Sequence, residues 1–193
     1  MTSLSSGTTA AASQEELDSE SGRRALRRVA AGVTVLTVNN DGLRHGTTVS
    51  AVVALSRTPL VVGVCLRASS TFTAMVRKAG VFSVNVLNDQ QGHLARQFAA
   101  PGRSHGDAQF EGVEWTADAL TGAPLIGGSL AHLACALSDC RQIGDHDLLT
   151  ADVLDGEPGS GSPLLTFAGR LHPEGVPDLG ASTRAGQSAR TTN

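Results

Sequence analysis

Residues 33–50 read VTVLTVNNDGLRHGTTVS, and this stretch decides the fold that the sequence predicts. Its first half has the two-residue period of a β-strand, with Val33, Val35 and Thr37 on one face and Thr34, Leu36 and Val38 on the other. Asn40-Asp41-Gly42 follows, a turn sequence that closes hairpins because these residues tolerate positive φ. The returning strand is then Leu43–Ser50, and the stretch predicts an antiparallel hairpin.

Further runs with strand character follow, separated by turn-forming residues. They are Ala51–Ser56, Leu60–Leu66, Val81–Leu87, Leu130–Cys140, Asp147–Leu154 and Leu164–Phe167. Because short strands joined by hairpin turns outnumber helices and no βαβ crossovers are evident, the sequence predicts a mainly β fold, an antiparallel barrel with a few flanking α-helices.

Three helices are expected. A capping box at Ser13 and Glu16 predicts a helix that runs to about Ala31, with Leu26, Val29 and Ala30 facing inward. The second helix is Thr71–Ala79. The third is Asp89–Phe98, which Asn88 caps with support from Gln91.

At 193 residues the chain suits one domain with a single substantial core. Both ends are rich in small and polar residues and carry too few apolar side chains to order themselves. We expect a disordered N-terminal tail over 1–18, a folded domain over 19–171 and a flexible C-terminal tail over 172–193.

Composition argues against several partners. The formal net charge is −3 and aromatic residues make up 3%, so the chain lacks the basic surface and stacking side chains of a nucleic-acid binder.

No apolar run reaches the roughly 20 residues that cross a bilayer, and the first dozen residues do not resemble a secretory signal. Cys65, Cys135 and Cys140 are expected to be buried thiols, although the spacing also allows a disulfide between Cys135 and Cys140. We expect a cytoplasmic protein.

Two runs of small hydroxyl residues, Gly46–Ser50 and Arg67–Thr71, predict a binding site. The second run opens the helix that starts at Thr71, so free backbone N–H groups, hydroxyls and Arg67 would converge where an anion binds. The first run ends a strand with side chains too small to exclude a flat ligand. Together they predict a site for a planar ring with a phosphate tail. The alternative is that Ser69 and Ser70 only cap the helix.

Other motifs favour no further chemistry. His132, Cys135, Asp139, Cys140 and His146 lie close in sequence, but their spacing matches no zinc pattern. Strand alternation would also put Cys135 and Cys140 on opposite faces, so we expect no metal site. The run Gly156–Ser162 lacks the context of a phosphate-binding loop and is expected to be a hairpin loop. No Gly-x-Ser-x-Gly elbow supports a hydrolase.

A set of segments occurs in an order and spacing that point to one family. They are Arg23–Leu26, Ala31–Thr37, His45–Ala51, Thr58–Val61, Val81–Leu87, Leu94–Ala99, Phe110–Trp115 and Gly144–His146. Together they resemble the short-chain flavin reductases that serve two-component monooxygenases, over about residues 20–171. The resemblance implies a homodimeric split β-barrel of the Greek-key, FMN-binding type. It also implies an enzyme that reduces FAD or FMN with NADH or NADPH and supplies free reduced flavin to a partner monooxygenase.

The resemblance further implies roles for particular residues. The flavin ring would lie on Thr48, Val49, Ser50 and Ala51, whose backbone N–H groups would stabilise negative charge on the reduced ring. The ribityl phosphate would be held by Cys65, Arg67, Ser69, Ser70 and Thr71. Arg96 and Phe98 would lie near the phosphate or adenosine end of the flavin. His146, the one residue given a catalytic role, would meet the nicotinamide.

The chain departs from the family near its C-terminal strands. Thr166, Phe167 and Ala168 stand where the family usually has Tyr or His, whereas Gly169 and Arg170 are kept. Phe167 and Arg170 are therefore the residues expected at the nicotinamide contacts. Two alternatives stay open: a non-catalytic flavin- or haem-binding split barrel, and a flavin oxidase that acts on its own substrate.

Overall fold

The hairpin predicted over residues 33–50 is present. In the computed structural model, which describes residues 20–173, β2 (Thr34–Asn40) pairs antiparallel with β3 (Leu43–Val49). Asp41 and Gly42 form the two-residue turn with φ of 53° and 89°. The predicted alternation is confirmed, and both faces of the strand are buried, since Val33 and Val35 belong to one core cluster and Leu36 and Val38 to another.

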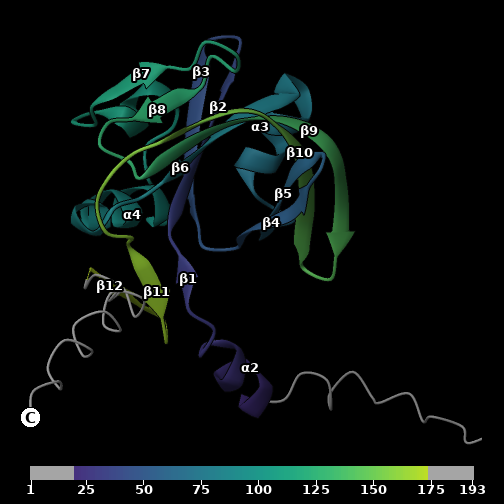
Figure 1. The fold of residues 1–193 in the computed structure, drawn as a ribbon, viewed down its shortest axis with the longest axis vertical. Coiled ribbons are helices and arrows are strands. Elements are labelled where there is room, and N and C mark those ends of the chain that lie inside the picture. Colours follow the sequence, from purple (N-terminus) through teal and green to yellow (C-terminus); the bar gives the residue numbers. More distant parts are fainter. Residues whose placement is uncertain (1–19, 174–193) are drawn as a thin grey trace, which may run out of the picture.

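Seven antiparallel strands form a sheet in the order β3-β2-β6-β9-β10-β5-β4. The remaining strands of this sheet are β4 (Val52–Arg57), β5 (Leu60–Arg67), β6 (Val81–Val86), β9 (Ala131–Ile143) and β10 (His146–Pro158). The two edge strands, β3 and β4, are consecutive in the chain and joined by Ser50 and Ala51. The sheet therefore curls into a barrel that is split between these edges (Figure 1). The prediction of a mainly β, antiparallel barrel is confirmed.

The helices beside the barrel begin and end close to the predicted residues. α3 (Thr71–Ala79) connects β5 to β6 and packs Phe72, Met75 and Val76 into the barrel core. A short 3₁₀ turn (Asp89–Gln91) leads into α4 (Gly92–Ala99), and the predicted capping box between Asn88 and Gln91 is formed. α4 places Leu94, Ala95 and Phe98 in the second core cluster, which also holds Val33 and Val35 from the β1–β2 segment.

Two small sheets complete the fold. β1 (Ala31–Gly32), β11 (Leu165–Phe167) and β12 (Arg170–His172) form one, and β7 (Trp115–Ala117) with β8 (Pro124–Ile126) forms the other. A 3₁₀ turn, η2 (Gly106–Phe110), precedes β7. β1, β7, β8 and β12 are too short to give a periodic signal. His172 pairs with Leu165, so ordered structure extends past the predicted boundary at residue 171. The expected tail over 1–18, the cap at Ser13 and the tail from residue 174 lie outside the described residues.

The predicted N-terminal helix is wrong in its extent and its burial. α2 (Glu20–Leu26) ends well before the predicted Ala31 and buries none of its described residues, and Ala30 beyond it is exposed. Leu26 is 73% exposed and Val29 is 68% exposed. The chain leaves the helix through a turn and runs along β1 to the barrel, so α2 stands apart from the core (Figure 1).

The segment Gly156–Ser162 is not a hairpin loop. β10 continues through Gly156 to Pro158, where it still pairs with β9, and the chain then crosses to the other sheet. There β11 pairs with β1 and β12 rather than with β10. The sequence suggested a turn because the run is rich in Gly and Ser, but the register of the long β9–β10 pair carries the strand through its first residues.

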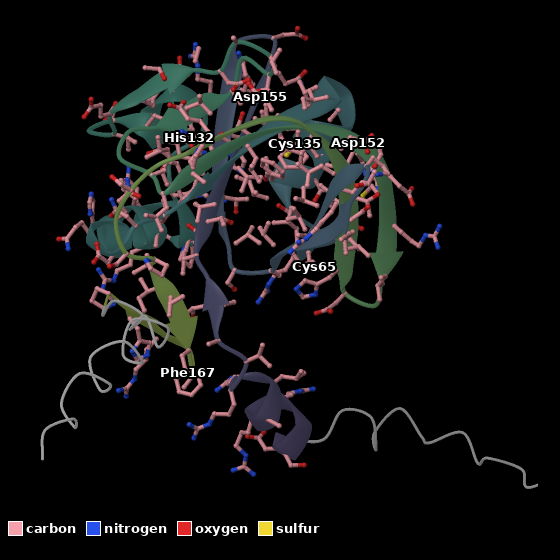
Figure 2. All side chains as sticks on the ribbon, in the orientation of Figure 1. Cys65, His132, Cys135, Asp152, Asp155 and Phe167 are labelled. Atoms are coloured by element: carbon pink, nitrogen blue, oxygen red, sulfur yellow. The ribbon has the colours of Figure 1, made fainter. Side chains whose placement is uncertain are left out.

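The expectation of three buried thiols holds for one cysteine. Cys135 is buried in the barrel, Cys140 is half-buried and Cys65 is exposed, and all are free thiols rather than a disulfide (Figure 2). Cys65 faces outward because its neighbours Val64 and Leu66 take the core-facing positions of β5. Cys135 and Cys140 do not face opposite ways: a register shift opposite Thr150 and Ala151 leaves Ser138 unpaired, so both cysteines contact the barrel core.

Candidate functional site

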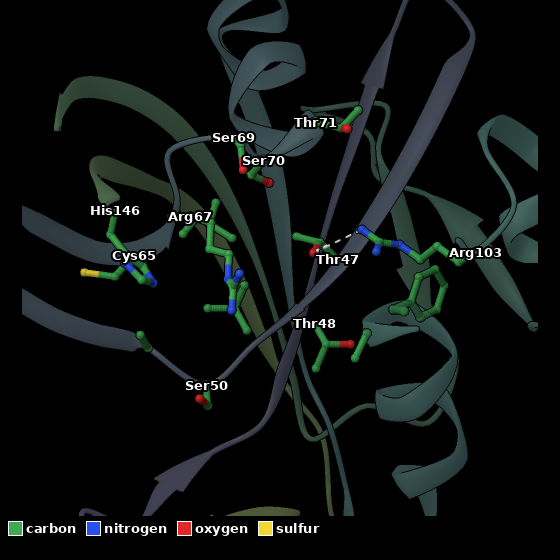
Figure 3. A pocket seen from close by; sticks show the side chains of 15 residues that line it. Thr47, Thr48, Ser50, Cys65, Arg67, Ser69, Ser70, Thr71, Arg103 and His146 are labelled. Carbon is green, nitrogen blue, oxygen red and sulfur yellow. Dashed lines mark hydrogen bonds between the residues drawn. The ribbon is translucent and has the colours of Figure 1, made fainter. Parts of the chain in front are cut away.

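The split in the barrel opens into a cavity of about 610 Å³. Its walls come from the end of β3, the β3–β4 link, the end of β5, the start of α3 and the start of β10 (Figure 3). The lining residues are Thr47, Thr48, Val49, Ser50, Ala51, Cys65, Leu66, Arg67, Ser69, Ser70, Thr71, Phe98, Ala99, Arg103 and His146. The two hydroxyl runs singled out in the sequence thus lie on one cavity, although a strand pair separates them in the chain.

The β3–β4 link gives the cavity one flat, open wall. Ser50 and Ala51 are exposed and lie outside both strands. The link is fixed in place because the backbone N–H of Cys65 donates to the carbonyl of Ala51 at 3.0 Å. The Thr48 hydroxyl donates to the carbonyl of Ala95 on α4 at 2.8 Å, so it anchors the helix. The small side chains and accessible backbone leave room for a flat ligand.

The start of α3 forms a second wall that can hold an anion. Ser70 occupies the N-cap position with extended backbone, but its side chain makes no capping hydrogen bond. Its backbone N–H donates to the carbonyl of Arg67 at 2.9 Å, which folds Arg67 back beside the helix start. The first-turn N–H groups of a helix have no intrahelical acceptor, and the helix dipole favours negative charge there. The Ser70 hydroxyl therefore does not cap the helix, and Ser70 lines the cavity.

His146 is held at the other strand end by its neighbour and by the sheet. It lies opposite Arg67 in the β10–β5 register, and the carbonyl of Asp145 accepts from the N–H of Ala68 at 3.0 Å. His146 Nδ1 is 2.8 Å from Asp145 Oδ1, and this hydrogen bond together with the imidazole charge lowers the pKa of Asp145. The carboxylate orients the ring, so that Nε2 is the nitrogen left for a ligand.

Arg103 lines the cavity although the sequence analysis did not single it out. It follows α4 in a polar loop, and its Nη2 donates to Thr47 Oγ1 at 3.4 Å (dashed in Figure 3). The same nitrogen is 3.5 Å from His45 Nε2. Burial, the charge of Arg103 and the nearby His105 lower the pKa of His45 to about 4, so this histidine is neutral near pH 7. The loop has no periodic pattern, and no sequence signal distinguishes Arg103 from the chain's other arginines.

Three predicted residues lie away from the cavity. Arg96 is exposed on α4 and does not line it. Phe167 (Figure 2) contacts the Arg28 guanidinium and the His172 ring in the small sheet. Arg170 is exposed on β12. Phe98 borders the cavity, but its side chain is fully buried against Phe110. It supports the wall from behind.

Residues 20–173 hold no group of three or more His, Cys, Asp or Glu side chains arranged to bind a metal ion. None of the helices in this range is long and apolar enough to span a membrane.

Known proteins share both the sequence pattern and the fold of this chain. The flavin reductase like domain family matches residues 26–175, most of the chain. The chain belongs to the flavin reductase family. An NADPH-flavin oxidoreductase of Streptomyces viridifaciens is 44% identical over 151 residues, which is 78% of each chain. The reductase component of a 4-nitrophenol 4-monooxygenase/4-nitrocatechol 2-monooxygenase of Rhodococcus opacus is 35% identical and covers 81% of this chain and 82% of its own.

Solved structures agree with these relatives. BorF, the flavin reductase component of a bacterial two-component tryptophan halogenase, superposes with a TM-score of 0.76 at 33% identity, over 83% of this chain and 99% of its own. The NADH:FAD oxidoreductase SgcE6 of Streptomyces globisporus, in complex with NAD and FAD fragments, superposes with a TM-score of 0.74 at 30% identity. The match covers 81% of this chain and 92% of its own. The prediction of an NAD(P)H-dependent flavin reductase is confirmed over the alternative of a non-catalytic flavin or haem binder.

Proposed function

We propose that this flavin reductase binds oxidised FAD or FMN in the cavity at the barrel split, with the ring on Thr48–Ala51 and the phosphate on Arg67–Thr71. The observation that carries the proposal is the convergence of both hydroxyl runs and His146 on one cavity. Its volume, about 610 Å³, lies within the range of small-molecule sites. The free Ser70 hydroxyl and the start of α3 suit a phosphate, and the small side chains of the β3–β4 link suit a flat ring.

The bound flavin supplies the redox chemistry, which is acceptance of a hydride from the nicotinamide. The chain's own residues position the flavin and the nicotinamide and stabilise the charge that develops on the flavin. Backbone N–H groups of the Thr48–Ala51 segment would stabilise the negative charge that the reduced flavin ring acquires, as in an oxyanion hole. His146, oriented by Asp145, donates from Nε2 to the nicotinamide carboxamide or to the dinucleotide phosphate. Arg67 and the α3 start neutralise the flavin phosphate.

Reduced flavin then leaves for a partner monooxygenase. Two similar proteins support this step, since one is the reductase component of a 4-nitrophenol monooxygenase and the other serves a two-component halogenase. A site built from hydroxyls and backbone, without an aromatic side chain stacked in the cavity, suits moderate affinity and release. Free thiols at Cys65, Cys135 and Cys140 suit a reducing cytoplasm, where we place the protein.

Steady-state kinetics with the four combinations of FAD or FMN and NADH or NADPH test this function. We expect catalytic amounts of the protein to oxidise NADH or NADPH, seen as a fall in nicotinamide absorbance, only when free flavin is present. We expect His146→Ala to raise the KM for NAD(P)H about tenfold while flavin affinity stays within twofold, because one hydrogen bond to a charged or polar group is lost. An unchanged KM would remove His146 from the nicotinamide site. Flavin that stays bound through gel filtration would instead favour an oxidase with its own substrate.

The enzyme is also proposed to be a homodimer. Four apolar side chains of β4, β5 and β10 are about half exposed: Val53, Leu55, Leu60 and Leu154. Two of them, Leu60 and Leu154, line a groove of about 440 Å³ with mainly apolar walls. Contiguous apolar surface of this kind marks a protein interface more often than a monomer's free face. A second copy of the chain is its proposed occupant.

A further inference from the structure

Arg103 is a half-buried cation whose charge the protein leaves uncompensated. Within residues 20–173 the ion pairs involve other residues, and none joins an Asp or Glu to Arg103. Its Nε is buried without a hydrogen-bond partner. Its remaining contacts, to Thr47 Oγ1, His45 Nε2 and the Ala100 carbonyl, are 3.4–3.5 Å long, which is weak for an N–H donor. Burial also lowers the pKa of Arg103.

Partial burial makes a charge without a partner unfavourable, so an anionic group of a ligand would stabilise the Arg103 guanidinium. Arg67, the other arginine that lines the cavity, is exposed. The neutral state of His45, whose pKa is about 4, leaves no second cation in contact with the guanidinium at pH 7. The free donors of Arg103 therefore suit a phosphate oxygen.

The position of Arg103 shows which part of a ligand it would meet. In Figure 3 it enters from the side opposite His146, with Thr47 between them. It also forms the wall between the main cavity and a second one of about 250 Å³ behind it. That second cavity is lined by small and polar side chains, namely Gln97, Ala100, Ser104, Ala108 and Gln109 besides Arg103. Arg103 lines both cavities, so a ligand group that contacts it in the main cavity lies beside the second one.

The geometry points to Arg103 as the residue that selects FAD over FMN, by binding the second phosphate and directing the adenosine toward the cavity of Gln97, Ser104 and Gln109. This inference rests on the proposed flavin site. The phosphate common to both flavins lies on Ser70, Thr71 and Arg67, and only FAD carries a further phosphate that reaches Arg103. Arg103 thus takes the part that the sequence assigned to Arg96.

Equilibrium binding of FAD and FMN distinguishes a specific contact of Arg103 with the second phosphate from a general effect of its positive charge. Quenching of flavin fluorescence gives Kd values for FAD and FMN with the wild type, Arg103→Met, Arg103→Gln and the control Arg141→Met, which removes an exposed arginine outside the cavity. We expect the wild type to prefer FAD, and both Arg103 variants to weaken FAD about tenfold or more while FMN changes less than twofold. Arg141→Met should change neither. Thermal melts verify that each variant is folded, and Arg103→Gln retains a donor for Thr47 should Arg103→Met fail to fold.

Equal weakening of FAD and FMN would overturn the inference, because Arg103 would then bind only the shared phosphate or act through net charge. Unchanged FAD affinity, or a wild type that prefers FMN, would overturn it as well. So would a loss seen only as a higher KM for NADPH relative to NADH, which would assign Arg103 to the nicotinamide nucleotide. The proposed flavin site fails separately, if the wild type does not bind FMN or if substitutions at the α3 start leave FMN binding unchanged.

Discussion

At the scale of single residues, the chemistry depends on donors that the fold leaves free. Ser70 is the clearest case, because an N-cap serine usually satisfies the helix start with its own side chain. Here the hydroxyl makes no capping bond and lines the cavity. The helix start and this hydroxyl together form the proposed phosphate site.

Replacing Ser70 and Thr71 by Ala removes two hydroxyl donors from that site. Each hydrogen bond to a charged group contributes about 1.5–3 kcal/mol, so we expect the Kd for FMN to rise at least tenfold. Riboflavin, which lacks the phosphate, should bind the variant as it binds the wild type. Fluorescence titrations with both ligands measure the difference. Parallel losses for riboflavin and FMN would mean that the hydroxyls shape the ring site instead.

The sequence predicts some of the residues that line the cavity and misses others. The hydroxyl runs and His146 could be predicted because each belongs to a recognisable segment and the resemblance fixed their order. Arg103 could not, since a polar loop without periodicity gives no direction to its side chain. Arg96 has the same charge and lies nearby in sequence, but its place on α4 turns it to solvent.

At the scale of elements, the cavity wall depends on close packing between β3 and α4. Gly46 lies on β3 opposite the ring of Phe98, and a Cβ built there would come within 2.6 Å of Phe98 Cε1. Its backbone is also held from both sides, by the Gln109 amide at 2.7 Å and 3.0 Å. Any side chain at residue 46 must displace a fully buried ring.

Gly46→Ala is therefore expected to destabilise the fold by about 1–3 kcal/mol, the usual cost of overpacking a core. Urea unfolding followed by circular dichroism measures the change. Gly32→Ala is the matched control, because a Cβ at Gly32 meets no atom within 4 Å and should alter stability by less than about 0.5 kcal/mol. A Gly46→Ala protein as stable as the control would mean that Phe98 moves freely and does not define the wall.

The elements that could be predicted are those with a local physical signal. The β2–β3 turn, the span of α3 and the capping box at Asn88 all match, since each depends on neighbouring residues. The errors arose from tertiary structure. α2 has apolar side chains that nothing within residues 20–173 covers, and Gly156 remains in a strand because β9 pairs with it. The register shift that leaves Ser138 without a partner on β10 likewise changes which way Cys140 points, and no sequence pattern predicts this shift.

At the scale of the whole molecule, the site exists because the barrel is not closed. β3 and β4 end the sheet at its two edges, and the short Ser50–Ala51 link forces those edges together. The backbone at this opening is accessible to a ligand, whereas backbone in the closed part of the barrel is paired. On β4, the strand that begins at this opening, Val53 and Leu55 are about half exposed and belong to the surface proposed as the dimer interface.

Leu55 tests that dimer most directly. Its side chain is 51% exposed and covers Gly63, where an added Cβ would come within 2.9 Å of it, so it stands on the outer face of the sheet and not in the barrel. A buried carboxylate without a partner is strongly unfavourable, and Leu55→Asp should dissociate the dimer. Light scattering after gel filtration should then give 19.8 kDa for the variant and about twice that mass for the wild type. Leu120→Asp, at a position that is 55% exposed and far from β4 in the chain, should remain dimeric. A wild type of 19.8 kDa, or a Leu55→Asp protein of dimer mass, would place the interface elsewhere or exclude it.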